Sequence, residues 1–256
     1  QYKKIDYFYD LVSNKVNLVI FDKGKNDEYQ HRYTYDADNR VTQMETSRDG
    51  INWDNDASYE YYDHGPLART ELGDQKVQGL DYVYTIQGWL KGVNSNTMNE
   101  TRDPGRDGDI GLTANDHAYV AKDAFGYSLS YFEGDYQSIQ SFSTTDFFVA
   151  KTTGSNLVNA RNDLWNGNIG SMVTCLPQAS SYSSSKTITP EAFGNAYKYD
   201  QLNRIAQSRV FTNVSYSQNE WLASGAANPQ AFGTNYTYDP MGNILSQKRN
   251  GAGITG

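Results

Sequence analysis

The stretch YTYDADNRV at residues 33–41 decides the fold, because variants of it recur along the chain. Recurrence of one short unit is typical of repeat architectures, in which each unit packs against the next. The other copies are YKYDQLNRI at 197–205, YTYDPMGNI at 236–244, YEYYDHGPL at 59–67, YVYTIQGWL at 82–90 and a degenerate copy that begins with YFYD at 7–10.

Each copy predicts a strand, a turn and a return strand. Two tyrosines separated by one residue point to the same face of a strand, and aromatic residues suit a pleated, half-buried surface. The Asp that follows, such as Asp36, favours a turn because its side chain bonds the nearby backbone. An Asn or Gly three residues later, such as Asn39 or Gly242, tolerates the positive φ of a hairpin loop with a bulge. The unit is therefore a hairpin with an aromatic face.

The predicted fold class is all-β, with antiparallel hairpins in one continuous curved sheet, since no segment shows sustained helical spacing of apolar residues. Tight turns are expected near 36–39, 63–65, 85–88, 200–203 and 239–242, and the tyrosines are expected to stack on those of adjacent repeats. The structural positions of the repeat are Tyr33, Tyr35, Asp36, Asn39, Tyr59, Tyr61, Gly65, Tyr82, Tyr84, Gly88, Tyr197, Tyr199, Asp200, Asn203, Tyr236, Tyr238, Asp239 and Gly242.

The chain divides by pattern into three segments of one continuous domain. Residues 1–92 and 196–256 hold the repeats, and residues 93–195 form an intervening β segment with long loops. Residues 93–116 lose the repeat and are rich in Asn, Asp and Gly, which predicts an exposed loop. Residues 155–166 are the best candidate for a short helix.

Composition limits the classes of function. Tyrosine is unusually frequent, at 21 residues, while hydrophobic residues make up only 38% of the chain, so the rings must supply much of the burial. A net charge of −8 argues against binding to a phosphate backbone, and hence against a nucleic-acid partner. The longest apolar run, residues 18–21, is far too short to span a bilayer. The single cysteine, Cys175, excludes an intrachain disulfide and is interpreted as a buried small hydrophobe.

Both ends of the sequence look like cuts, and we expect a piece of a longer protein. The chain has no initiator Met, and it stops soon after Asn250-Gly251, a hairpin signal without its return strand. Residues 251–256 match the G-x-G-x-x-G pattern of dinucleotide-binding loops, but no helix follows, so a hairpin turn is the better interpretation.

Candidate chemical sites are few. Asp103, Asp107 and Asp109 offer oxygen ligands for Ca²⁺, but their spacing is not that of an EF-hand, and a solvated loop is favoured. Asp54 beside Trp53 suggests glycosidase chemistry, which requires two carboxyl groups at a set separation. No pair among the three histidines, His31, His64 and His117, has metal-ligand spacing. We therefore expect no catalytic centre, no cofactor and no metal.

Tyr-Asp repeats of this form resemble the YD repeats of the Rhs family of large secreted bacterial proteins. Three linking stretches are also similar to Rhs-repeat proteins of the Bacteroidota type: DYVYTIQGWLKGVN at 81–94, VAKDAFGYSL at 120–129 and WNGNI at 165–169. The resemblance covers most of the chain. It implies an extracellular or cell-surface location and hairpins that spiral into a hollow shell.

The same resemblance implies function and partners. A shell of this family encloses a polypeptide cargo, often a C-terminal toxin, so the expected partners are further YD repeats and a cargo domain of the same polypeptide. Two alternatives stay open: an adhesin that grips cell-surface glycans, and a client of the type IX secretion machinery. A glycosidase is a further alternative.

Overall fold

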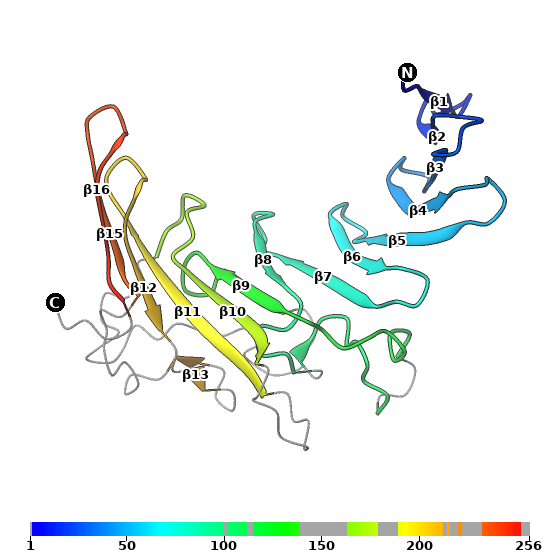
Figure 1. Cartoon of the computed structure of the whole chain (residues 1–256). Coiled ribbons are helices and arrows are strands. Elements are labelled where there is room, and N and C mark those ends of the chain that lie inside the picture. The colour runs from blue at the N-terminus through cyan, green and yellow to red at the C-terminus, as the bar shows by residue number, and fades with distance from the viewer. Residues whose placement is uncertain are drawn as a thin grey trace. The chain divides into compact units, whose positions relative to one another are not determined.

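The computed structural model describes residues 2–99, 102–111, 115–138, 163–178, 189–211, 214–215, 220–221 and 232–251. This part of the chain is all-β and antiparallel, as predicted, and fourteen strands pair in sequence order (Figure 1). The strands are β1 (Ile5–Tyr9), β2 (Val16–Phe21), β3 (Tyr29–Tyr35), β4 (Val41–Ser47), β5 (Asp54–Tyr61), β6 (Leu67–Leu72), β7 (Gln78–Tyr84), β8 (Leu90–Val93), β9 (Gly126–Ser130), β10 (Ser171–Gln178), β11 (Thr189–Tyr199), β12 (Ile205–Phe211), β15 (Thr234–Tyr238) and β16 (Ile244–Arg249), with a separate pair β13 (Val214–Ser215) and β14 (Glu220–Trp221).

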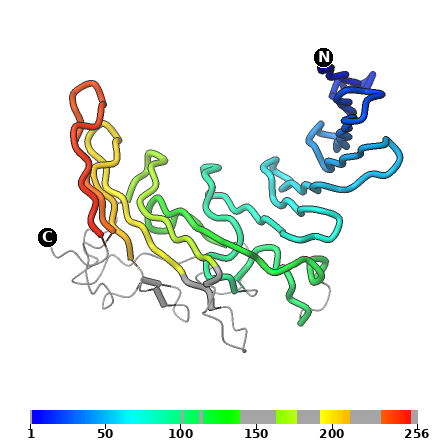
Figure 2. Tube along the Cα trace, in the orientation of Figure 1, coloured from blue at the N-terminus to red at the C-terminus, as the bar shows by residue number. Residues whose placement is uncertain are grey.

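Contacts divide the chain into two compact units, and Figure 2 follows the trace through each of them in colour order. Unit 1 comprises residues 1–81 and 105–123, and unit 2 comprises residues 82–104 and 124–256. These units do not coincide with the three segments expected from the sequence. Residues 105–123 belong with the early hairpins, because a buried charge cluster described below ties this loop to β6 and β7.

Each repeat forms the predicted hairpin turn. In the copy at 33–41 the Asp36 amide donates to the Arg40 carbonyl and the Asn39 amide donates to the Asp36 carbonyl, both at 3.0 Å. Asn39 has a φ of 62°, and the register shifts by one residue at Tyr35, which is the expected bulge. The turns at 63–65, 85–88, 200–203 and 239–242 follow the same pattern, with positive φ at Gly65, Gly88, Asn203 and Gly242.

The turn aspartate holds the loop together through its side chain. Asp36 Oδ1 accepts hydrogen bonds from the amides of Asp38 and Arg40, both at 2.9 Å, and Oδ2 accepts one from Arg40 Nε at 2.7 Å. The Arg40 amide makes the largest contribution to lowering the pKa of Asp36 below its usual value. Asp200 and Asp239 bind their own turns in the same way. The Asp of the repeat is therefore a local cap for the turn.

The second tyrosine of a repeat joins its hairpin to the one before. Its hydroxyl donates to a backbone carbonyl at or just before the start of the preceding return strand. In two cases the guanidinium of the preceding turn, Arg40 or Arg204, lies 4.5 Å from the centre of the ring. Tyrosine stacked on tyrosine occurs within a strand, between Tyr236 and Tyr238. The hydroxyl bonds are Tyr35 to Val16 (2.7 Å), Tyr61 to Val41 (2.8 Å), Tyr131 to Leu90 (2.8 Å), Tyr199 to Ile169 (2.9 Å) and Tyr238 to Ile205 (2.7 Å).

One register serves all five of these junctions. Count two positions forward from the residue whose carbonyl accepts the bond, and three positions back from the tyrosine. At every junction these two residues lie opposite each other in the antiparallel strand pair. Because a slip of one residue would turn every side chain to the other face, this constancy keeps the tyrosines of successive hairpins equivalent. The pairs are Leu18 with Arg32, Gln43 with Ser58, Gly92 with Ser128, Ser171 with Ala196, and Gln207 with Asn235.

The segment after β8 differs from the expected exposed loop. Asn94, Ser95 and Asn96 are completely buried. Asn96 Nδ2 donates to Ser128 Oγ at 2.7 Å, and a Cβ at Gly126 would lie 1.9 Å from the Ser95 carbonyl oxygen. The prediction was wrong here because polar composition favours exposure only when no neighbouring strand supplies hydrogen-bond partners.

The predicted helix at 155–166 falls mainly on residues 155–162, which lie outside the described residues. Residues 163–166 are described and are not helical, and Trp165 and Asn166 form a turn. Within the described ranges, no helix is long and apolar enough to cross a membrane.

Candidate ligand-binding pocket

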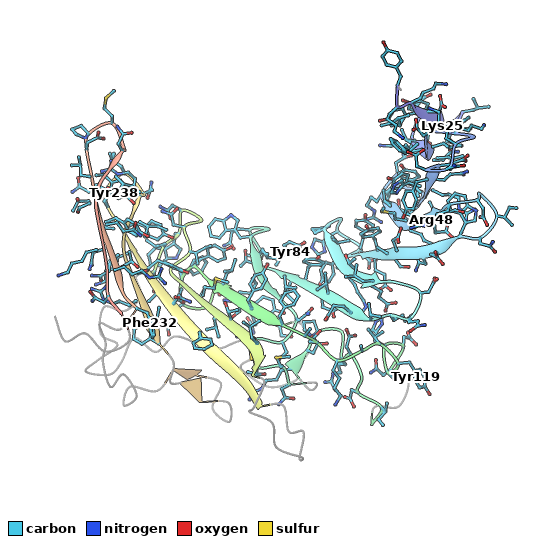
Figure 3. All side chains as sticks on the ribbon, viewed as in Figure 1. Lys25, Arg48, Tyr84, Tyr119, Phe232 and Tyr238 are labelled. Carbon is cyan, nitrogen blue, oxygen red and sulfur yellow. The ribbon has the colours of Figure 1, made fainter. Side chains whose placement is uncertain are left out.

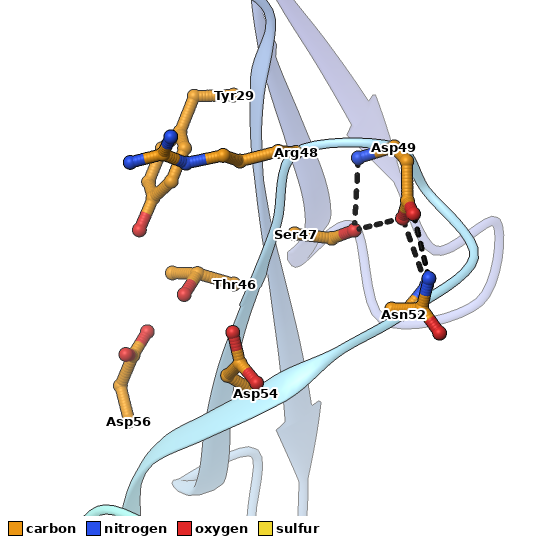
Figure 4. A pocket seen from close by; sticks show the side chains of 8 residues that line it. All are labelled: Tyr29, Thr46, Ser47, Arg48, Asp49, Asn52, Asp54 and Asp56. Carbon is orange, nitrogen blue, oxygen red and sulfur yellow. Dashed lines mark hydrogen bonds between the residues drawn. The ribbon is translucent and has the colours of Figure 1, made fainter.

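An open pocket of about 370 Å³ lies in unit 1 beside the loop that joins β4 to β5 (Figure 4). Three strands and one loop supply its walls, and all of them belong to the first three hairpins. The lining residues are Tyr29 on β3, Thr46 and Ser47 on β4, Arg48, Asp49 and Asn52 on the loop, and Asp54 and Asp56 on β5.

A β-bulge sets the acidic wall of this pocket. Thr46 pairs directly with Asp54, whereas Asp56 is the extra residue where the register shifts between β4 and β5. Bulges commonly redirect a side chain next to a functional site. Figure 4 shows Thr46, Asp54 and Asp56 on one side of the pocket, with their oxygen atoms turned toward one another.

The loop on the opposite side is held rigidly by Asp49. Its Oδ1 accepts hydrogen bonds from the amides of Ile51 and Asn52, both at 2.8 Å, and from Ser47 Oγ at 3.0 Å. These bonds, led by that of the Ile51 amide, hold the pKa of Asp49 far below its usual value. Asp49 is therefore committed to the loop and is not available to a ligand.

Ser47 and Asn52 bind the same loop, whereas three other side chains of the pocket make no hydrogen bond or ion pair with a described residue. Thr46 is only 6% exposed, and its hydroxyl makes no hydrogen bond with any described residue. Asp56 Oδ2 is buried and likewise has no partner among these residues. Arg48, labelled in Figure 3, is exposed on the loop and forms no ion pair with a described residue. Buried polar atoms without a partner are rare in proteins, and each one calls for an explanation.

Trp53 lies next to Asp54 in the sequence but has a different role. Its ring lies 4.2 Å from the guanidinium of Arg32, which also binds Glu45 through two hydrogen bonds of 2.8 Å. Its indole nitrogen donates to the Gly50 carbonyl at 3.3 Å. The neighbouring Trp-Asp pair seen in the sequence is therefore divided between packing and the pocket.

A buried charge cluster in unit 1 also had no sequence signal. Arg69, which is 3% exposed, donates to Asp81 at 2.5 Å, to Asp107 at 2.6 Å and to Glu71 at 3.1 Å. Burial alone would lower the pKa of the Arg69 guanidinium, but the carboxylates of Asp81 and Asp107 outweigh it and raise that pKa. His117 Nδ1 lies 3.0 Å from Glu71 Oε1. The cluster ties the 105–123 loop to β6 and β7.

The acidic loop residues considered for Ca²⁺ are divided between the two units. Asp107 is buried and engaged by Arg69, whereas the Asp109 carboxylate lies 3.7 Å from Arg106. Asp103 is buried in unit 2. The interpretation of this loop as solvated was therefore wrong for Asp103 and Asp107, because the loop packs its acids inward.

The repeat positions predicted from the sequence lie at the hairpin turns and their strands, and none of them lines the pocket. The structure brings Asp36, Arg40 and Tyr61 together in one contact, which joins two repeats. Cys175 is fully buried as predicted, and burial raises the pKa of its thiol to about 12, so the thiol stays protonated at neutral pH.

Sequence reasoning missed most of the pocket. It also missed Tyr131 as a repeat tyrosine, since Leu129 stands where the first tyrosine of the Tyr-x-Tyr pair would be. A usable signal was present at the pocket, because alternate residues Asp54 and Asp56 place two acids on one short strand after the Arg48-Asp49-Gly50 turn.

Comparison with known proteins assigns this chain to no family. No protein-family model matches the sequence, and a search of the curated proteins finds no match.

Proposed function

We propose that this chain is a wall segment of a secreted Rhs/YD-repeat protein, a structural shell that encloses a polypeptide cargo such as a C-terminal toxin. The observation that carries the proposal is the single register found at five hairpin junctions across both units. A sheet that adds hairpins at constant register can be extended without any new kind of contact. That property suits a wall whose area grows with the number of repeats.

The tyrosine contacts support the same proposal. Each hydroxyl bond satisfies a carbonyl at the end of a hairpin, and each ring covers part of a neighbouring strand, so a sheet with few apolar residues gains burial and polar pairing together. In this proposal the segment is not an enzyme. Its partners are further YD repeats and the cargo domain of its own polypeptide, and it is located outside the cell or at the bacterial surface.

The test uses the full-length polypeptide. We expect electron microscopy to reveal a closed shell with density inside, and we expect the enclosed domain to resist protease until the shell is denatured. Tyr61→Ala, which removes a junction between hairpins, should expose the cargo to protease, whereas Glu60→Ala, at the exposed position beside it on β5, should not.

The competing function is a cell-surface adhesin, which could also be exported by the type IX system. If the assembly is empty or open and the full-length protein binds bacterial or host glycans, the proposal of a shell is wrong and the adhesin is the better explanation. Hydrolysis of a glycan by the purified chain, abolished by one carboxylate substitution, would favour the glycosidase instead.

A further inference from the structure

The pocket between β3, β4 and β5 is a built receptor for a small polar molecule. Thr46 is more than nine-tenths buried and leaves its hydroxyl without a partner on the pocket wall. Asp56 leaves one buried carboxylate oxygen without a donor. A ligand with hydroxyl groups would supply a partner to the Thr46 hydroxyl on the pocket wall.

The lining selects the class of ligand. Asp54 and Asp56 can only accept hydrogen bonds when ionised, Arg48 can only donate them, and a hydroxyl such as that of Thr46 can do both. The ring of Tyr29 adds an apolar surface at the same pocket. A sugar ring matches this set, because its hydroxyls donate and accept and its C–H face packs on an aromatic ring.

We propose that this pocket binds a neutral saccharide. Asp54 and Asp56 accept hydrogen bonds from adjacent sugar hydroxyls, Arg48 donates to another hydroxyl, and Thr46 completes the contacts at the base. The volume of about 370 Å³ is within the usual range for small-molecule pockets. This site is independent of the wall function, because none of the repeat tyrosines or turn aspartates contributes to it.

A bare cation fits the pocket less well. Ca²⁺ takes six to eight oxygen ligands. The pocket offers the carboxylates of Asp54 and Asp56 and one hydroxyl, since Asp49 is committed to its loop. In the described residues, the three-carboxylate group close enough to share an ion does not include any of these residues. Arg48 at the rim would also repel a cation.

The position of Asp54 and Asp56 on one strand, β5, favours binding of a sugar over its hydrolysis. A glycosidase requires carboxyl groups that flank the scissile bond, with one of them protonated. Asp54 and Asp56 are two residues apart on β5 and reach the pocket from one wall, so both approach the same side of a ligand. This arrangement suits hydrogen bonds to adjacent hydroxyls, and Asp49 on the opposite side is bound to its own loop.

The experiment is saturation-transfer NMR and calorimetry of the purified chain with methyl glycosides of glucose, galactose, mannose and N-acetylglucosamine. We expect at least one of these sugars to bind at millimolar concentrations. Asp56→Asn and Thr46→Val should each weaken binding about tenfold, since a hydrogen bond to a charged or buried group carries that much free energy. Asp63→Asn and Thr34→Val are matched controls on exposed positions and should bind like the unsubstituted chain.

Folding of the variants is checked by circular dichroism and melting temperature. Arg48→Gln gives an independent test, because Arg48 is exposed on the loop and its loss should weaken sugar binding without affecting the fold. The proposal is overturned if none of the four glycosides binds, or if Arg48→Gln, Asp56→Asn and Thr46→Val all bind as the unsubstituted chain does. Terbium luminescence that requires Asp54 and Asp56, without sugar binding, would replace the saccharide by a metal ion.

Discussion

The two units stabilise the same kind of hairpin in different ways. Unit 2 contains a contiguous apolar cluster on β10, β11 and β12, whereas unit 1 buries a charge cluster centred on Arg69. Among the described residues of unit 1, the buried apolar side chains are those of Ile20, Ala57 and Val120, which lie on separate segments. The cluster of unit 2 consists of Val173, Cys175, Ala192, Ala196 and Phe211.

This difference follows from the side chains that the strands and loops of each unit contribute to its interior. Strands β10 and β11 pair along eight residues, and their buried pairs are Ser171 with Ala196, Val173 with Gly194 and Cys175 with Ala192. In unit 1 the strands β6 and β7 carry Arg69, Glu71 and Asp81, and the 105–123 loop adds Asp107. Hairpins built from the same repeat can therefore be joined by the same tyrosine contact and still pack on different kinds of buried side chain.

The largest expected effect comes from breaking the ionic interior. Arg69→Met removes the buried guanidinium that binds Asp81, Asp107 and Glu71 and should lower the free energy of unfolding by about 3–5 kcal/mol. Hydrogen exchange should increase in β5–β7 and in the 105–123 loop, and remain unchanged in β10–β12. Arg48→Met on the surface is the control. A loss below about 1 kcal/mol would contradict the assigned role of the cluster.

The apolar interior should respond in the complementary way. Phe211 is 7% exposed, and Phe211→Ala should cost about 3 kcal/mol, through lost burial and the cavity that remains. Chemical denaturation measures the loss, and hydrogen exchange should now increase in β10–β12 while unit 1 stays protected. Equal destabilisation of both units by each variant would show that the two interiors unfold as one.

The junctions between hairpins should behave alike in both units. Tyr35→Phe in unit 1 and Tyr199→Phe in unit 2 each remove one hydroxyl bond to the preceding hairpin, and each should cost about 1 kcal/mol. Tyr33→Phe is the matched control, because the hydroxyl of Tyr33 has no hydrogen-bond partner among the described residues. Thermal melts measure the difference, and a cost for Tyr33→Phe equal to that of Tyr35→Phe would refute the role of the hydroxyl.

The smallest effect concerns acid. The side chain of Lys3, followed by the Lys4 amide, lowers the pKa of Asp22 from 3.8 to about 2. A carboxyl group with a lowered folded pKa contributes stability above its unfolded pKa and loses it as the pH falls through the folded value. Unit 1 should therefore lose stability between pH 3.8 and about 2, and Asp22→Asn should flatten that part of the curve. A curve unchanged by this substitution would argue against the ion pair.

The hairpins were predictable because their determinants are local. Asp36 and Asn39 act within a few residues of their own turn, so the turn, the positive φ and the bulge could all be inferred from nine residues. The register between hairpins was not inferred, although it uses the same tyrosines. The hydroxyls of Tyr35 and Tyr61 bind the carbonyls of Val16 and Val41, and the sequence contains no signal for these acceptors apart from the tyrosine itself.

The pocket was only partly visible in the sequence. Asp54 could be proposed as a candidate acid, but Thr46 gains its role by lying opposite Asp54 across two strands, and Asp56 gains its role from a bulge. Neither the bulge nor the burial of Thr46 follows from residue type, since threonine is common on either face of a strand.

The sequence by itself determined an all-β chain of repeated hairpins, because alternation, turn chemistry and φ preference act within one repeat. Only the tertiary structure decided which polar residues became buried. Arg69 collects partners at positions 71, 81 and 107, and Asn94–Asn96 lie under a strand that begins at Gly126. Such sites depend on which segments pack together, and composition alone makes these residues look exposed. Burial of a charge is tolerated where several distant groups converge on it, and only the folded chain brings them there.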